Sequence, residues 1–117
     1  MTLTREQILG ADDRKNETVD VPEWGGAVKV RSMSGAEAEK YTEIVSEEGR
    51  SGVANLALLV SMCVVDEDNK PLFSDEDIKA LAEKDINVLN AVATACMKVN
   101  GFEHEKVAAG LKETASE

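Results

Sequence analysis

The segment from Val53 to Ile86 constrains the fold of this chain more than any other part of the sequence. It begins with an apolar run, VANLALLVSMCVV, in which Asn55 and Ser61 are the only polar side chains. A helix with so little polar surface is buried on most of its sides. The run is too short for a membrane span, which needs about 20 apolar residues. We therefore expect a helix from Val53 to Val64 that is either the centre of a small bundle or a surface for another chain.

The apolar run ends in an acidic turn, DEDNKPLF, after which the chain continues as SDEDIKALAEKDI. Ser74 suits a helix N-cap because its hydroxyl can accept a hydrogen bond from a first-turn N–H, and acids follow it where the helix dipole favours negative charge. This pattern predicts a helix from Ser74 to about Glu83. In the turn itself, Pro71 shapes the chain, and we expect Leu72 and Phe73 to anchor it to the core.

The acidic turn also has some of the spacing of a calcium-binding loop. Asp66, Asp68 and Asp77 stand at its first, third and twelfth positions. The match fails at the fifth position, where Lys70 is a cation, and at the sixth, where Pro71 replaces the glycine that allows a sharp turn. We predict a polar connector and no metal site.

Alternating valines before the apolar run indicate a β-hairpin. Val19 and Val21 precede a PEWGG turn, and Val28 and Val30 follow it. Because side chains alternate along a strand, all four valines can lie on one face, which must be covered. Trp24 in the turn either packs on this face or is exposed to a partner, and the burial preference of large aromatic side chains favours packing.

Two further helices are expected. In MSGAEAEKYTEIVSEEG, Ser34 and Glu37 form a capping box and Gly49 suits a left-handed C-terminal cap. One side of this helix carries a narrow apolar stripe of Ala38, Tyr41, Ile44 and Val45. The acidic face of Glu39, Glu43 and Glu47 is either solvated, which we favour, or a surface for a basic partner. The second helix runs from Ile86 to Val99. It is amphipathic, with Asp85 as its N-cap and Gly101 just past its end.

The two ends of the chain are less regular. Thr4 and Gln7 have the spacing of a capping box, which predicts a short helix or turn that ends near Gly10. At the other end, FEHEKVAAGLKETASE is weakly helical to about Leu111, and we expect residues 112–117 to fray.

Length and composition then define the fold class. A chain of 117 residues fits a single domain over residues 1–117, and 43% hydrophobic but only 3% aromatic residues predict an aliphatic core. We predict a mainly helical α+β fold, in which the N-terminal β-hairpin packs on a bundle of about four helices.

Charge excludes several classes of function. A net charge of -10 argues against binding to nucleic acid or to anionic membrane surfaces, which attract clustered Lys and Arg side chains. No N-terminal segment looks like a signal peptide, so we expect a cytosolic protein. The charge alone also suggests an acidic inhibitor that mimics DNA. Such an inhibitor needs an ordered array of acidic side chains, whereas the acids here are mixed with 13 basic residues, so we consider this function a weaker alternative.

No catalytic site is recognisable. Cys63 and Cys96 lie in apolar helical segments without CxxC spacing, so we predict two buried thiols, with no metal, redox centre or cofactor. His104 has no serine or cysteine nucleophile in a recognisable setting, and the chain has no glycine-rich phosphate loop. We do not expect an enzyme.

Two stretches of the sequence resemble the tail assembly chaperones of long-tailed, lambda-like bacteriophages and related prophages. They are LTREQILGADDRKNETVDVPEWGG and CVVDEDNKPLFSDEDIKALAEKDINVLNAV. A family phrase SGxExxxYxxxV also lies between them, from Ser34 to Val45. The chain departs from the family by having Asn69 where glycine is common, and asparagine is among the residues that tolerate a left-handed backbone.

The resemblance implies a non-catalytic assembly factor that binds the tape measure protein, keeps it soluble and helps recruit tail tube subunits. It also implies self-association, action in the host bacterial cytoplasm and absence from the mature virion. In the family that the chain resembles, recruitment of the tube protein is associated mainly with a longer product of a ribosomal frameshift, and by this resemblance we expect the chain to correspond to the short form. The family's interaction residues have no sharp motif, so no partner-binding residue is assigned. A small structural component of the tail or connector, retained in the virion, is the main alternative.

Overall fold

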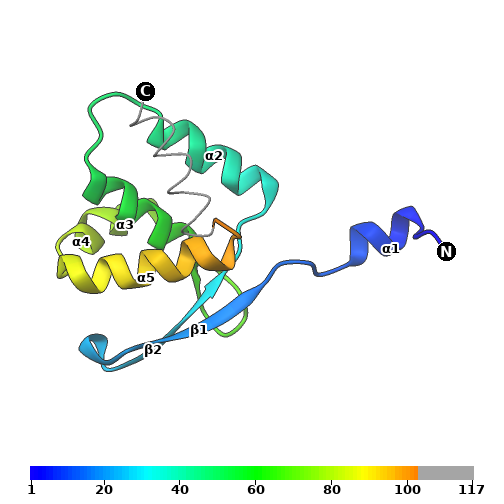
Figure 1. Cartoon of the computed structure of the whole chain (residues 1–117), viewed down its shortest axis with the longest axis horizontal. Coiled ribbons are helices and arrows are strands. Elements are labelled where there is room, and N and C mark those ends of the chain that lie inside the picture. Colours follow the sequence, from blue (N-terminus) through cyan, green and yellow to red (C-terminus); the bar gives the residue numbers. More distant parts are fainter. Residues whose placement is uncertain (103–117) are drawn as a thin grey trace.

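The computed structural model describes residues 1–102, in which a small antiparallel sheet is covered on one side by helices (Figure 1). The predictions for the C-terminal tail, a weak helix to Leu111 and fraying over residues 112–117, lie outside the described residues. Along the chain, the helices and strands are α1 (Arg5–Gly10), β1 (Asn16–Val21), β2 (Gly26–Arg31), α2 (Gly35–Val45), α3 (Gly52–Cys63), β3 (Val64–Val65), α4 (Ile78–Ala82) and α5 (Ile86–Val99). Short 3₁₀ turns, η1 (Pro22–Trp24) and η2 (Asp75–Asp77), lie in the hairpin and before α4.

The predicted hairpin is confirmed. Strands β1 and β2 are antiparallel, with Val19 opposite Val28. Val21 and Val30 are buried, and Val19 and Val28 are half buried against the same core. The four valines therefore share one face, as their spacing requires.

The sheet has a third strand that the sequence interpretation missed. Val64, the predicted end of the helix, and Val65, the last residue of the apolar run, form strand β3 and pair with Val30 and Lys29 of β2, respectively. Both residues are β-branched, which favours the extended backbone. Their pairing also provides hydrogen-bond partners for backbone groups on the edge of β2 that faces away from β1. Helix α3 therefore ends at Cys63 rather than at Val64.

Helix α3 is the central helix, which decides between its two predicted roles. Helices α2, α4 and α5 all contact it, while α5 also lies against β1 and β2. Its residues from Ala57 to Ser61 are buried, so it belongs to the core and offers little surface to another chain. As predicted, the buried core is aliphatic with the two thiols. Its main cluster consists of Val21, Val30, Ala57, Leu59, Val60, Cys63, Val64, Leu81, Val88, Leu89, Val92, Ala93, Cys96 and Val99.

Helix α2 is attached more loosely, although its start is well defined. The Ser34 hydroxyl accepts a hydrogen bond from the Glu37 N–H at 3.2 Å, and a Glu37 carboxylate oxygen accepts one from the Ser34 N–H at 2.9 Å. The apolar stripe is half buried and the acidic face is exposed, as expected. Gly49 is left-handed, with φ +81°, but the helix has already ended at Val45, so this glycine serves the following turn rather than the cap.

The connector between β3 and α4 is a turn built around one carboxylate. A side-chain oxygen of Asp66 accepts hydrogen bonds from the Asp68 N–H at 2.8 Å and the Lys70 N–H at 3.0 Å. Asn69 between them has φ +65°. The left-handed backbone expected where the family commonly has glycine is therefore present, and asparagine accommodates it.

The connector is held to the core differently from the prediction. Phe73 packs against the core, but the side chain of Leu72 is 52% exposed. The Leu72 contribution comes from its backbone, since its N–H donates to the Val64 carbonyl oxygen at 3.1 Å beside an antiparallel bridge between Val65 and Pro71. Leu72 therefore anchors the turn through the sheet, with its side chain turned to solvent.

The helical segment after the connector begins at Ser74 as predicted, and Ser74 and Asp77 form a capping box. An oxygen of the Asp77 carboxylate accepts hydrogen bonds from the Ser74 N–H at 2.9 Å and from the Ser74 hydroxyl at 3.2 Å. The first turn is 3₁₀ and becomes α-helical only at Ile78.

Helix α5 follows its prediction closely. Asp85 caps it by accepting hydrogen bonds from the Asn87 N–H at 2.9 Å and the Val88 N–H at 3.3 Å, and Gly101 is left-handed just beyond its end. Among residues 1–102, every helix is too short or too polar to cross a membrane.

Candidate protein-interaction site

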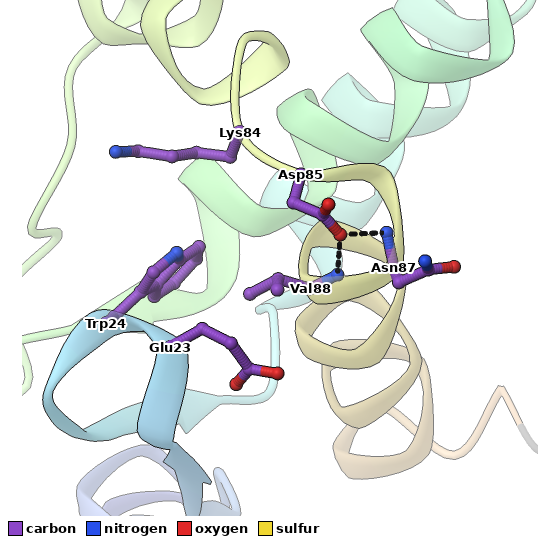
Figure 2. A pocket seen from close by; sticks show the side chains of 6 residues that line it. All are labelled: Glu23, Trp24, Lys84, Asp85, Asn87 and Val88. Atoms are coloured by element: carbon purple, nitrogen blue, oxygen red, sulfur yellow. Dashed lines mark hydrogen bonds between the residues drawn. The ribbon is translucent and has the colours of Figure 1, made fainter.

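A hollow of about 460 Å³ lies between the hairpin turn and the start of α5 (Figure 2). We call it the turn pocket. It brings together two segments that are far apart in the sequence, the PEWGG turn and the junction of α4 with α5. Its lining residues are Glu23, Trp24, Lys84, Asp85, Asn87 and Val88.

The hairpin turn fixes the tryptophan side of the turn pocket. Pro22 begins the η1 turn, where its ring pre-sets the backbone φ angle, and Gly25 closes it with φ +84° and an N–H that donates to the Pro22 carbonyl oxygen at 3.0 Å. Trp24 is partly buried against the core, so the predicted packing is confirmed. The same indole also lines the pocket, so part of its surface is open to a partner.

The opposite side of the turn pocket is the first turn of α5. Val88 is only 7% exposed, and its side chain points toward Trp24 (Figure 2). The carboxylate of Asp85 is already engaged by the Asn87 and Val88 N–H groups. An apolar floor of one indole and one valine therefore lies beside a carboxylate that is used for helix capping.

Besides Asp85, two further exposed charges line the turn pocket, at its rim. They are Glu23 and Lys84, and within residues 1–102 neither forms an ion pair. An apolar floor flanked by charges of both signs suits the recognition of a protein segment, in which an apolar side chain is covered and polar groups set the orientation.

A smaller hollow of about 180 Å³ lies where α2, α3 and the connector meet, and its residues come from all three. Met62, Pro71 and Phe73 provide its apolar surface. Glu37 in its wall is already used, because its carboxylate accepts hydrogen bonds from the Ser34 N–H and from the Arg14 guanidinium, the latter at 2.7 Å. This hollow is therefore a second, more confined place where a side chain of a partner could be covered.

The two cysteines are buried as predicted and lie together between α3 and α5. Hydrogen bonding from the Cys96 thiol lowers the pKa of the Cys63 thiol, burial opposes this, and the Asn100 amide, 3.4 Å from the Cys63 sulfur, adds to the lowering. The same thiol–thiol hydrogen bond and burial raise the pKa of Cys96. The pair is enclosed in the core and is not part of the surface site.

No catalytic or metal-ligating residue was assigned from the sequence, and the described part of the chain holds no group of three or more His, Cys, Asp or Glu side chains placed to hold a metal ion. His104 lies outside the described residues. The turn pocket was missed because its two walls are far apart in the chain. The lone tryptophan in the PEWGG turn was the one available signal.

No protein-family model matches this sequence. A search of curated proteins found no match either. The fold, however, has a counterpart among solved structures.

The chain has a small α+β fold, in which a β-hairpin is extended by a short third strand and is covered by helices on one side. The solved structure described as bacteriophage HK97 tail assembly chaperone has this fold, with a TM-score of 0.60 and 24% sequence identity, over 80% of this chain and 90% of that chain. The similarity establishes the fold, and it confirms the tail-assembly-chaperone fold expected from the sequence.

Proposed function

We propose that this protein is a tail assembly chaperone of a long-tailed phage. In this role it binds the tape measure protein non-catalytically, keeps it soluble and helps recruit tail tube subunits. The observation that carries the proposal is the fold shared with the HK97 tail assembly chaperone over most of both chains. Independent support comes from the family phrases in the sequence, including a connector whose left-handed residue is Asn69.

The surface chemistry fits a protein that holds an aggregation-prone client. A net charge of -10 keeps the chaperone soluble and limits its own aggregation. Apolar side chains are nevertheless exposed at scattered places on the described surface, namely Met1, Leu3, Ile8, Leu9, Val53, Leu72, Ile86 and Phe102. Because α3 is enclosed by the other elements, client binding uses this outer surface and not the apolar helix.

Co-expression with the tape measure protein of the same genome tests the client. We expect the soluble yield of the tape measure protein to rise and the two proteins to purify as a complex. An unrelated acidic protein of similar size is the control, because charge alone should not produce either effect. If neither solubility nor complex formation changes, the client assignment is wrong.

The proposal also includes self-association, action in the bacterial cytoplasm and departure before the virion is complete. A longer frameshifted product would carry the contact with the tail tube protein, and a slippery heptamer near the stop codon would support it. Mass spectrometry of purified virions should find this chain absent. Abundant peptides of it in mature particles would instead favour a structural component that is retained in the tail.

A further inference from the structure

The first eleven residues form an arm that stands apart from the rest of the molecule (Figure 1). The arm contains α1, which begins with a complete capping box between Thr4 and Gln7, so the short helix predicted there is confirmed. None of its residues is buried, and Leu3, Ile8 and Leu9 are 68%, 57% and 67% exposed. An isolated helix of this length is marginal in water, and apolar side chains on it gain stability when another surface covers them.

Contacts at the base of the arm fix where it leaves the body. The Asp12 carboxylate lies 3.0 Å from the Arg31 guanidinium. The Arg14 guanidinium donates to the Ser32 carbonyl oxygen at 2.8 Å and to the Glu37 carboxylate at 2.7 Å. These contacts hold the arm at the open end of the hairpin, where β1 begins and β2 ends. The turn pocket lies at the opposite end, beyond the length of β1, about 20 Å away.

The arm and the turn pocket match in chemistry. The arm offers Ile8 and Leu9, and the pocket has the apolar floor formed by Trp24 and Val88. Both surfaces also carry exposed charges of both signs. On the arm these are Arg5 and Glu6, whose side chains are 76% and 79% exposed and 3.6 Å apart, and an exposed pair of this kind is weak enough to be exchanged for other partners. On the pocket they are Glu23 and Lys84 at the rim, together with Asp85, whose carboxylate already caps α5.

We infer that the arm of one copy docks in the turn pocket of a second copy. Ile8 and Leu9 cover Trp24 and Val88, Arg5 approaches the partner's Glu23, and Glu6 approaches the partner's Lys84. This inference rests on the proposed self-association and names the two surfaces that carry it. Because they are different surfaces at opposite ends of the hairpin, each bound copy retains one free arm or pocket, and assembly continues until a ring closes or an open chain grows.

Sedimentation velocity of the full chain over a range of concentrations tests the inference. An arm variant, I8D/L9D, places charge on exposed positions outside the core, and a pocket variant, E23K/K84E, reverses both rim charges. We expect each to raise the concentration of half-assembly by about tenfold or more. Leu72→Asp, a matched change of an exposed apolar residue away from both surfaces, should assemble like the unaltered protein. Circular dichroism checks that every variant is folded.

Two combinations make the test specific. In E23K/K84E, adding R5E/E6R restores opposite charges across the contact and should recover assembly. Mixing the arm variant with the pocket variant leaves one intact arm and one intact pocket, so we expect one-to-one pairs that grow no further. Larger assemblies in that mixture would contradict a head-to-tail contact.

The possible outcomes distinguish a failure of the arm–pocket contact from a failure of the proposed self-association. If the unaltered protein is monomeric at all concentrations, the proposed self-association fails, and the inference with it. If it assembles and both variants assemble equally well, only the arm–pocket assignment is wrong. If the arm variant assembles normally but no longer binds the tape measure protein, the arm serves the client and the inference is also overturned.

Discussion

The side-chain oxygen of Asn100 accepts a hydrogen bond of 2.6 Å from the backbone N–H of Met33, across 67 positions of the sequence. The amide nitrogen of Asn100 donates to the Cys96 carbonyl oxygen at 2.7 Å and contacts the Cys63 sulfur at 3.4 Å. A single half-buried side chain thus joins the link between β2 and α2, the end of α3 and the end of α5.

Substitution of Asn100 should therefore destabilise the whole domain. In Asn100→Ala, the Met33 N–H loses its acceptor in a partly buried position, and we expect the free energy of unfolding to fall by about 1–3 kcal/mol. Urea denaturation measures the change. Asn90→Ala, at an exposed position of the same helix, is the control and should stay within about 0.5 kcal/mol of the unaltered protein. Equal stability of the two variants would show that the Asn100 hydrogen bonds contribute little.

The left-handed backbone at Asn69 predicts opposite results for two small substitutions. Alanine at φ +65° places its Cβ close to the following carbonyl oxygen, so Asn69→Ala should lower the free energy of unfolding by about 1–2 kcal/mol. Asn69→Gly relieves this conflict and should change it by less than about 0.5 kcal/mol. Chemical denaturation of both variants measures the difference. A glycine variant as unstable as the alanine variant would mean that the asparagine side chain, and not the backbone, determines the connector.

The neighbouring residues Leu72 and Phe73 should differ in their contribution to stability. Phe73 packs against the core, and we expect Phe73→Ala to lower the free energy of unfolding by about 1–3 kcal/mol, less than for a fully buried aromatic side chain. Leu72 is exposed and holds the turn through its backbone, so Leu72→Ala should have an effect below about 0.5 kcal/mol. Thermal or urea unfolding distinguishes them. A large effect at Leu72 would restore the anchoring role predicted from the sequence.

Glu37 has two separable contributions at the start of α2. It accepts the Ser34 N–H and pairs with Arg14, so Glu37→Ala removes both contacts and should cost about 1–2 kcal/mol of unfolding free energy. Glu37→Gln retains an oxygen for the cap and removes the ion pair, for which we expect less than about 1 kcal/mol. Glu39→Ala on the exposed face is the control. Urea denaturation at low and high salt measures the difference in the free energy of unfolding between the unaltered protein and Glu37→Gln. We expect this difference to shrink at high salt, and a difference that does not depend on salt would argue against the ion pair.

Tyr41 should make the protein less stable in alkali. Burial raises the pKa of Tyr41 above its ordinary value of 10.0, helped by Cys63 and opposed by Arg50. Below about pH 10 the phenol is neutral in both states and its contribution is fully present. As the pH rises further, the unfolded chain releases the proton first, so stability is lost up to the folded-state pKa.

The test compares the unaltered protein with Tyr41→Phe. We expect the variant to gain stability relative to the unaltered protein as the pH rises above about 10, because its ring cannot ionise. Tyr41 is the only tyrosine, so tyrosinate absorbance measures its titration directly in the folded protein. A folded-state pKa at or below the ordinary value would contradict the burial argument.

The sequence alone determined the features that depend on neighbouring residues. Capping boxes at Thr4 and Ser34 and the Asp85 N-cap were predicted correctly because each is closed by hydrogen bonds within a single turn. The hairpin was predicted from the alternation of its valines, and the aliphatic core from the composition of the chain. Burial on most sides of α3 followed from its lack of a polar face.

Tertiary structure alone decided the remaining features, because these depend on segments that are distant in the chain. Val64 and Val65 are compatible with a helix end or a strand, and the unpaired edge of β2 selects the strand. The backbone bridge at Pro71 turns the Leu72 side chain outward. In the turn pocket, folding brings Trp24 beside the first turn of α5. The position of the arm opposite that pocket is likewise a property of the folded chain.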